Sequence, residues 1–288
     1  MGEWFHILRE PASSILSRTT GFIAAAGFTH SLTPARNCTF GCTYCYVPTM
    51  RIQGGLKPDD WRRWGQFTTY KSNAADLLRR SIKGREVIYC SPLVDPYQPA
   101  EQHESAMPGL LEALIDTPPL VFTIQPRGCL ILRDLPLLTA LARRTTLRVS
   151  FSLTTDREDV RRWYEPHCDP IPDRIAAIRQ LIAAHIDTYA TLAPILPCDP
   201  IQLTQLALDS THRPIIGDPF HTRHVKRHGA TTRPQAAQVS RHHGFDDWHQ
   251  PGFQQAVVER IACHAASQGR QFAIGPEAFQ WLAQTTTN

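Results

Sequence analysis

The residues best suited to chemistry are three cysteines in one short stretch. Cys38, Cys42 and Cys45 have the spacing C-x3-C-x2-C. Thiolates this close together on one loop can hold three corners of a cubane iron–sulfur cluster. Gly41 lets the backbone turn tightly between the ligands. We therefore predict a 4Fe–4S cluster bound by these three cysteines.

Three protein ligands leave the fourth iron of such a cluster open. An open iron can chelate the amino and carboxylate groups of S-adenosylmethionine. One electron from the cluster then breaks a carbon–sulfur bond, while the protein orients the cofactor. Two alternatives stay open: a zinc site completed by a residue such as His30, or three unrelated core thiols. Zinc sites usually have two pairs of ligands a dozen or more residues apart, and the sequence has no second pair.

The elements that must position this loop follow a repeated pattern, in which short apolar runs alternate with stretches of helical periodicity. The strands expected are 28–32, 86–90, 120–124, 147–153, 187–192 and 214–216. The helices expected are 74–82, 104–115, 135–143, 173–184, 200–208, 253–267 and 276–284. Repeated strand–helix units imply an α/β fold with a parallel sheet under covering helices. Residues 211–250, rich in Pro, Gly and His, break the pattern and are expected to form a long loop.

Several stretches carry a family resemblance. The cysteine motif, with Tyr44 before its last cysteine, resembles the signature of the radical S-adenosylmethionine superfamily. Other stretches resemble the spore photoproduct lyase-like branch of this superfamily. They occur in the family's order over residues 28–200, which is about 60% of the chain. They include Asp95-Pro96-Tyr97-Gln98-Pro99-Ala100-Glu101, Leu132-Arg133-Asp134, Ser150-Phe151-Ser152-Leu153-Thr154-Thr155, Tyr164-Glu165-Pro166, Asp173-Arg174 and Ala193-Pro194-Ile195.

This resemblance implies a partial (β/α)6 barrel with the cluster loop after the first strand and a helical C-terminal extension. The domains expected are an N-terminal extension (1–27), the barrel (28–217), and a His/Arg-rich loop with C-terminal helices that pack on the barrel (218–288).

The resemblance also implies roles for individual residues around the cofactor. It implies that Tyr44 packs against the adenine side, that Ser152 bonds the ribose or the methionine end, and that Ser91 lies near the cofactor. The C-terminal ends of parallel strands, where ligands bind in such folds, agree with this placement. For Ser152, a core hydroxyl bonded to the backbone is the alternative.

Two further residues are similar in place to residues that move hydrogen in spore photoproduct lyases. Cys90, at the end of the second strand, corresponds to a cysteine that donates a hydrogen atom to the substrate radical. Tyr46 corresponds to a tyrosine that relays hydrogen toward the cofactor. Buried thiols and aromatic rings are also ordinary core residues, which is the alternative for both.

One position departs from the lyase pattern. The branch carries a Lys after Thr123 that faces the cofactor carboxylate, whereas this chain has Ile124 and Gln125. We expect Arg127 or Arg133 to supply that charge. Glu165 and Arg174 are expected to form an ion pair at the barrel mouth.

Composition limits the classes of protein. No apolar stretch reaches the roughly 18 residues needed to span a bilayer, and no secretory signal is visible, so we expect a cytoplasmic protein. We also expect it to be a monomer or weak dimer. The eight cysteines are then not a disulfide framework. Residues 211–243 contain six Lys or Arg and one acid, which suits phosphate binding or a solvated loop.

Three functions follow, in order of preference. The first is hydrogen abstraction from a nucleotide or nucleoside, including carbon–sulfur tailoring. The second is repair of a DNA lesion, disfavoured by the short chain. The third is an electron carrier or sensor, which normally completes its cluster with a fourth cysteine. An enzyme of this kind needs an electron donor of the flavodoxin or ferredoxin type.

Overall fold

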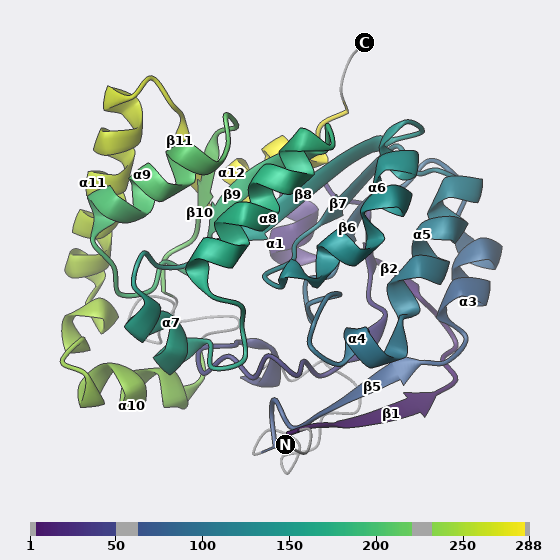
Figure 1. The fold of residues 1–288 in the computed structure, drawn as a ribbon, viewed down its shortest axis with the longest axis horizontal. Helices are drawn as coiled ribbons and strands as arrows, with labels where there is room; N and C mark the ends of the chain where they lie inside the picture. The colour runs from purple at the N-terminus through teal and green to yellow at the C-terminus, as the bar shows by residue number, and fades with distance from the viewer. Residues whose placement is uncertain (1–3, 50–62, 221–231, 286–288) are drawn as a thin grey trace.

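The computed structural model describes residues 4–49, 63–220 and 232–285. Its main sheet has eight strands in the order β11-β10-β9-β8-β7-β6-β3-β2 (Figure 1). All neighbours pair parallel except β2 and β3. The strands are β2 (Leu16–Arg18), β3 (His30–Leu32), β6 (Val87–Cys90), β7 (Val121–Ile124), β8 (Thr146–Ser152), β9 (Asp187–Leu192), β10 (Ile215–Gly217) and β11 (Phe272–Ile274). Among the described residues the edge strands β2 and β11 do not pair with each other, so the sheet does not close into a barrel.

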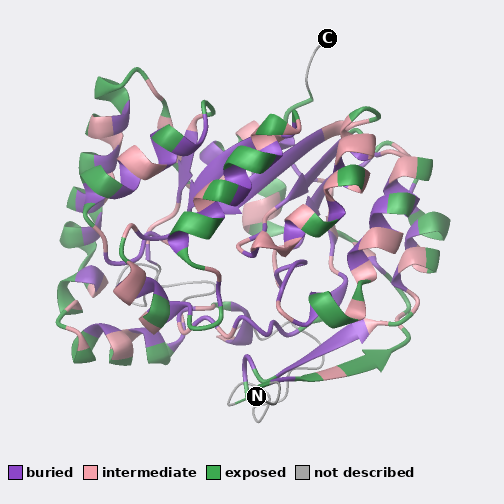
Figure 2. Ribbon diagram, viewed as in Figure 1, coloured by how far each residue is buried: buried purple, intermediate pink, exposed green. Residues whose placement is uncertain are grey.

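One face of the sheet is covered by helices. These are α3 (Ala74–Ser81), α5 (Ala106–Asp116), α6 (Leu135–Ala142) and α8 (Ile171–Ala183). Their apolar side chains form the largest core cluster together with alternate strand residues such as Ile88, Phe122 and Val149. Figure 2 shows the strands largely buried and the outward faces of these helices exposed. At the β10 side of the sheet, α9 (Pro200–Ser210) packs on α11 (Pro251–Ser267).

The opposite face of the sheet is covered by α12 (Gly275–Ala283), against which α1 (Gly21–Ala25) packs. Thr123 Oγ1 on β7 donates a hydrogen bond to the carbonyl of Leu282 at 2.8 Å. Arg148 Nη1 on β8 donates to the same carbonyl at 3.2 Å. The polar residues on this face are therefore paired where α12 covers them.

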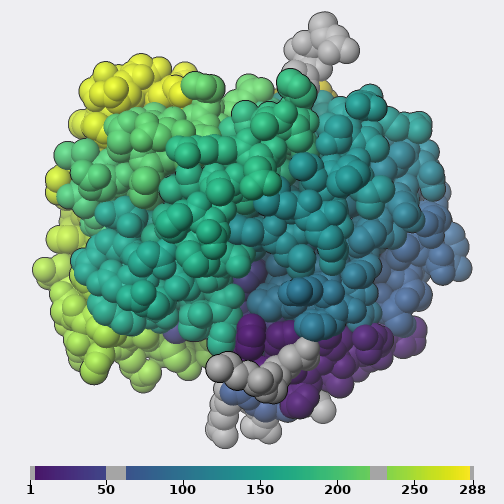
Figure 3. Space-filling view, in the orientation of Figure 1, coloured from purple at the N-terminus to yellow at the C-terminus, as the bar shows by residue number. Residues whose placement is uncertain are grey.

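A second, smaller sheet borders the cysteine loop. It consists of β1 (His6–Glu10), β5 (Phe67–Lys71) and β4 (Ala35–Arg36), in the order β1-β5-β4. Figure 1 shows β1 and β5 below the main sheet, and in Figure 3 the N-terminal part of the chain lies along the lower edge of the molecule. The remaining elements are η1 (Val47–Thr49), α4 (Glu101–Glu104), η2 (Cys129–Asp134), α7 (Glu158–Tyr164), α10 (Pro234–His242) and η3 (Asp246–His249).

The alternation of strands and helices from residue 74 to 217 is confirmed. The prediction of one long loop over 211–250 is wrong, because it contains α10 and η3. Pro234 suits the first turn of a helix, where its missing N–H is not needed, and Ala236 and Ser240 bury one face. The cations Arg223, Lys226 and Arg227 of the same basic stretch lie outside the described residues. Among the described residues no helix combines the length and apolar character needed to cross a bilayer.

Candidate cluster and cofactor site

The cysteine loop runs from β4 to η1 and is built from tight turns. The N–H of Gly41 donates to the carbonyl of Cys38 at 3.3 Å, and that of Cys45 to the carbonyl of Cys42 at 3.2 Å. Gly41 has a φ of +62°, in the left-handed region that glycine adopts at no steric cost. Cys38 and Cys42 are buried and Cys45 is half-buried. The loop thus brings three thiols into one shielded region.

The donors available on the loop are three thiols. Within the described part of the chain, no three His, Cys, Asp or Glu side chains are already grouped around one metal position, which applies to the cluster and to zinc alike. His30, the residue considered for a zinc site, contacts the hydroxyl of Thr29 through Nδ1 at 2.9 Å. The three cysteines of one loop remain the available ligands, and thiolates are the usual ligands of iron–sulfur clusters.

Burial and two cations set the protonation of these thiols. Burial raises the pKa of Cys45 to about 12. Burial also raises the pKa of Cys38. A hydrogen bond from Cys168 lowers the pKa of Cys42 against the effect of burial, helped by the charge of Arg127. Arg127 and the buried Arg233 also favour the thiolate of Cys45, whereas the negative charge of Asp95 acts against the thiolate of Cys38.

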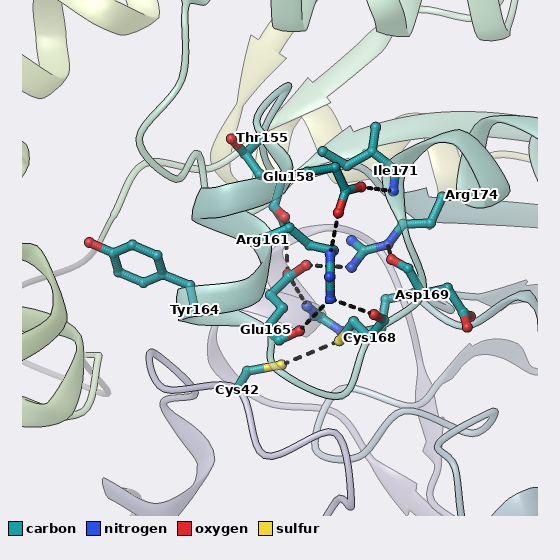
Figure 4. A network of polar contacts seen from close by, with 12 residues as sticks. Cys42, Thr155, Glu158, Arg161, Tyr164, Glu165, Cys168, Asp169, Ile171 and Arg174 are labelled. Carbon is teal, nitrogen blue, oxygen red and sulfur yellow. Dashed lines mark hydrogen bonds and ion pairs between the residues drawn. The ribbon is translucent and has the colours of Figure 1, made fainter. Parts of the chain in front are cut away.

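The loop is tied to the rest of the fold through Glu165, which is fully buried. Its Oε1 accepts hydrogen bonds from Tyr44 Oη at 2.5 Å, Arg127 Nη1 at 2.8 Å and Thr154 Oγ1 at 3.0 Å. Its Oε2 pairs with Arg174 Nη2 at 2.6 Å, which confirms the predicted ion pair (Figure 4). Burial alone would raise the pKa of Glu165, but Arg174 and Arg127 outweigh it and lower the pKa to about 2.

Of the two arginines expected near the cofactor, the structure places Arg127 beside the loop. Its guanidinium bonds to the hydroxyl of Tyr44, and its backbone N–H donates to Asp95 Oδ2 at 2.8 Å. Arg133 lies in a different network, where it pairs with Glu101 at 2.9 Å and with Asp134 at 2.8 Å. Cofactor binding by Arg133 stays a prediction, and the geometry favours Arg127.

The two predicted serines have different surroundings. Ser152 ends β8 on the face opposite the helix layer, and its Oγ is buried without a hydrogen-bond partner among the described residues. A buried polar atom normally has a partner, so this hydroxyl is suited to a bound group. Ser91 Oγ donates to Thr33 Oγ1 at 3.3 Å. Both serines stay candidates for cofactor binding, as does Tyr44, whose ring is buried while its hydroxyl bonds to Glu165.

The candidates for hydrogen transfer also differ. Cys90 ends β6 as predicted and is fully buried, with burial raising the pKa of its thiol so that it stays protonated. It pairs in register with Leu32 and Ile124, and all three belong to the core between the sheet and its helices. Tyr46 is 38% exposed, and its hydroxyl donates to the carbonyl of Pro92 at 2.6 Å. The transfer roles of Cys90 and Tyr46 stay predictions, and the packing of Cys90 favours a core role.

Sequence reasoning missed one neighbour of the cluster loop. Cys168 Sγ lies 4.0 Å from Cys42 Sγ (Figure 4). The two residues are 126 positions apart, and no motif spacing links them. The only signal is that Cys168 follows the Tyr164-Glu165-Pro166 stretch by two residues.

No family model matches the chain. Uncharacterized proteins of Mycobacterium tuberculosis and Mycobacterium bovis are each 31% identical to it over 184 residues, which cover 60% of this chain and 52% of theirs. An uncharacterized protein of Acidianus two-tailed virus is 26% identical over 169 residues, 57% of this chain and 54% of that protein. The chain thus spans about half the length of the curated relatives it matches.

Solved structures resemble the chain over nearly all of its length. A cysteine-to-serine mutant of spore photoproduct lyase matches with a TM-score of 0.60 and 13% identity, covering 93% of this chain and 82% of that one. Spore photoproduct lyase complexed with a dinucleoside spore photoproduct matches with a TM-score of 0.59 and 12% identity over the same shares. The chain therefore has a fold like that of spore photoproduct lyase.

Proposed function

We propose that this chain is a radical S-adenosylmethionine enzyme that abstracts hydrogen from a nucleotide- or nucleoside-type substrate. The observation that carries the proposal is the loop of three shielded thiols, Cys38, Cys42 and Cys45, on the fold described above. The unpaired hydroxyl of Ser152, at the end of a parallel strand, supplies a second and independent support.

The residues have separable tasks in this proposal. The three cysteines hold a 4Fe–4S cluster, which when bound supplies the electron that cleaves S-adenosylmethionine to a 5′-deoxyadenosyl radical. Arg127 provides positive charge beside the loop, and Ser152 donates to or accepts from the cofactor. Tyr44, held by Glu165, fixes the loop so that its ligands keep one geometry.

The substrate class is supported by the structural comparison. The spore photoproduct lyase structure holds a dinucleoside, so a fold of this kind accommodates two linked nucleosides. We rank a nucleotide-sized substrate first and include carbon–sulfur tailoring among its reactions. Repair of a DNA lesion is the second candidate, favoured by the same complex. A flavodoxin- or ferredoxin-type protein is the proposed electron donor, and the chain is proposed to act as a monomer or weak dimer.

Anaerobic reconstitution tests the central claim. The protein should bind about four irons and four sulfides per chain and form 5′-deoxyadenosine when reduced with S-adenosylmethionine. Cys42→Ala should abolish both, whereas the exposed Cys263→Ala should change neither. Stoichiometric zinc in the freshly purified protein, with no uptake of iron, would contradict the proposal.

A further inference from the structure

The contact between Cys42 and Cys168 is not explained by the roles assigned above. The two sulfurs lie 4.0 Å apart, within the range of a sulfur hydrogen bond, and both side chains are buried. Cys168 lies in the connection between α7 and α8, and two bonds fix its backbone. Its N–H donates to the carbonyl of Glu165 at 3.1 Å, and its carbonyl accepts from Arg161 Nη1 at 2.8 Å.

The end of α7 and the connection that follows it contact three consecutive residues of the cluster loop. Cys42 meets Cys168, the N–H of Thr43 donates to the carbonyl of Tyr164 at 2.9 Å, and Tyr44 Oη donates to Glu165. Figure 4 shows Cys42 and Cys168 pointing toward each other, with the Glu165 and Arg174 pair beside them. The distance between the two sulfurs is therefore held from both sides and is not a chance approach of mobile side chains.

The role of Cys42 decides which sulfur donates. A cysteine that ligates iron is a thiolate and carries no proton. With Cys42 as a cluster ligand, Cys168 is the member of the pair that can donate a hydrogen bond, and Cys42 accepts it. Hydrogen bonds to the sulfurs of a cluster favour the reduced form, because that form carries more negative charge on the sulfurs.

We propose that Cys168 is a positioning residue that donates an S–H hydrogen bond to the sulfur of Cys42 and so raises the reduction potential of the cluster that Cys42 helps to hold. This inference rests on the proposed function, since it takes Cys42 as a cluster ligand. It assigns Cys168 no contact with the substrate or with S-adenosylmethionine.

A fourth cluster ligand is the competing role for Cys168, and it would close the iron that the cofactor needs. Among the described residues, Cys42 is the cluster cysteine whose sulfur lies within hydrogen-bond distance of Cys168. The 4.0 Å contact fits either role, because two thiolates on one tetrahedral metal lie at a similar separation. The iron content of the Cys168 variants therefore decides between the two roles.

The test compares reconstituted Cys168→Ala and Cys168→Ser with the unaltered protein by redox titration monitored with electron paramagnetic resonance. Cys168→Ala should still bind about four irons, but its reduction equilibrium should shift about tenfold toward the oxidised cluster, about 59 mV for one electron. Cys168→Ser keeps a donor and should recover most of the shift. Cys198→Ala, a half-buried thiol in another core cluster, should match the unaltered protein.

The outcomes separate this inference from the proposed function. A cluster in Cys168→Ala with an unchanged potential would overturn the inference alone. An iron content that falls to about three in both variants would make Cys168 a ligand and overturn it as well. Failure of the unaltered protein to bind iron would refute the proposed function before any variant is compared.

Discussion

At the scale of single residues, Ser152 offers a test in which stability and binding move differently. Its hydroxyl is buried without a partner, whereas Ser150, two residues earlier on the same face, contacts Thr191 Oγ1 at 2.5 Å. Ser152→Ala should leave thermal unfolding of the cofactor-free protein unchanged or slightly improved, since it removes an unpaired polar atom. It should weaken S-adenosylmethionine binding about tenfold, through the loss of about 1.4 kcal/mol.

Ser150→Ala is the matched control for that experiment. It should destabilise the protein by about 1–2 kcal/mol, because Thr191 loses its partner, and leave the affinity for S-adenosylmethionine unchanged. Equal affinities in Ser152→Ala and the unaltered protein, measured by calorimetry, would return Ser152 to a structural role.

Cys90 is the residue for which resemblance and packing disagree. Its side chain lies with Leu32 and Ile124 in the helix-covered core, so we expect Cys90→Ala to cost about 1 kcal/mol of stability and to leave product identity unchanged. Isotope content of the product formed in heavy water is the measurement. Loss of deuterium from the product of Cys90→Ala, with 5′-deoxyadenosine formation intact, would instead establish the hydrogen-donor role.

Glu165 makes a prediction about pH. Its pKa is lowered from 4.5 to about 2 in the folded protein, so its ionised form stabilises the fold above pH about 4.5 and loses that effect as pH falls toward 2. Glu165→Gln leaves Arg174 buried without its anion and should cost about 3 kcal/mol at pH 7. Urea unfolding should show this difference shrinking below pH about 4.5. The exposed Glu112→Gln should show little difference at either pH, and a constant gap for Glu165→Gln would contradict the assignment.

At the scale of elements, two glycines fix the shape of the cluster loop. Gly65 has a φ of +95°, and a Cβ on it would lie 2.7 Å from the Cα of Gly41. Gly65→Ala should therefore displace the loop and reduce the iron bound on reconstitution by about half. Gly269→Ala is the control, since its φ is +68° and its Cβ would meet nothing within 4 Å. Equal iron contents in the two variants would show that the contact between the glycines is unimportant.

The elements also show what sequence alone can reveal. The strands and helices from residue 74 to 217 were predictable because short apolar runs mark the buried parallel strands and helical periodicity marks the helices between them. The strand β1, with the sequence HILRE and four of its five residues exposed, has no such apolar run. Its partner β5 is far along the chain, with His6 in register with Phe67. β11 has three residues and is only half-buried, so its pairing with β10 depends on tertiary contacts.

The same division applies to the site. A family stretch marked the Glu165–Arg174 pair, which the structure confirms, and a local motif marked Cys38, Cys42 and Cys45, whose cluster role stays a prediction. Three other features of the site were not predictable, because each depends on contacts between segments that are distant in the sequence. They are the contact of Cys168 with Cys42, the position of Arg127 rather than Arg133 beside the loop, and the face of the sheet on which Cys90 packs. The spacing of residues along the chain indicates loops and periodic elements. It does not indicate which elements contact one another in the fold.

At the scale of the whole molecule, charge bears on the substrate. The net charge is +4, and the stretch 211–243 holds six Lys or Arg against one acid. Of these, Arg233 lies buried at the start of α10 near the cluster loop, which connects the basic stretch to the site.

That connection predicts how binding depends on salt. For a single-stranded ligand, each phosphate that the protein neutralises makes the slope of log affinity against log salt concentration steeper by about 0.7. Replacing Arg223, Lys226 and Arg227 by Ser should lower the slope for a short single-stranded oligonucleotide by about 2 and leave cluster assembly unchanged. Replacing the exposed Arg79 and Arg80 on α3, which are not part of the basic stretch in the sequence, should leave the slope nearly as it was. Affinity that does not change with salt in the unaltered protein would remove the basic stretch from substrate binding and favour a substrate without phosphates.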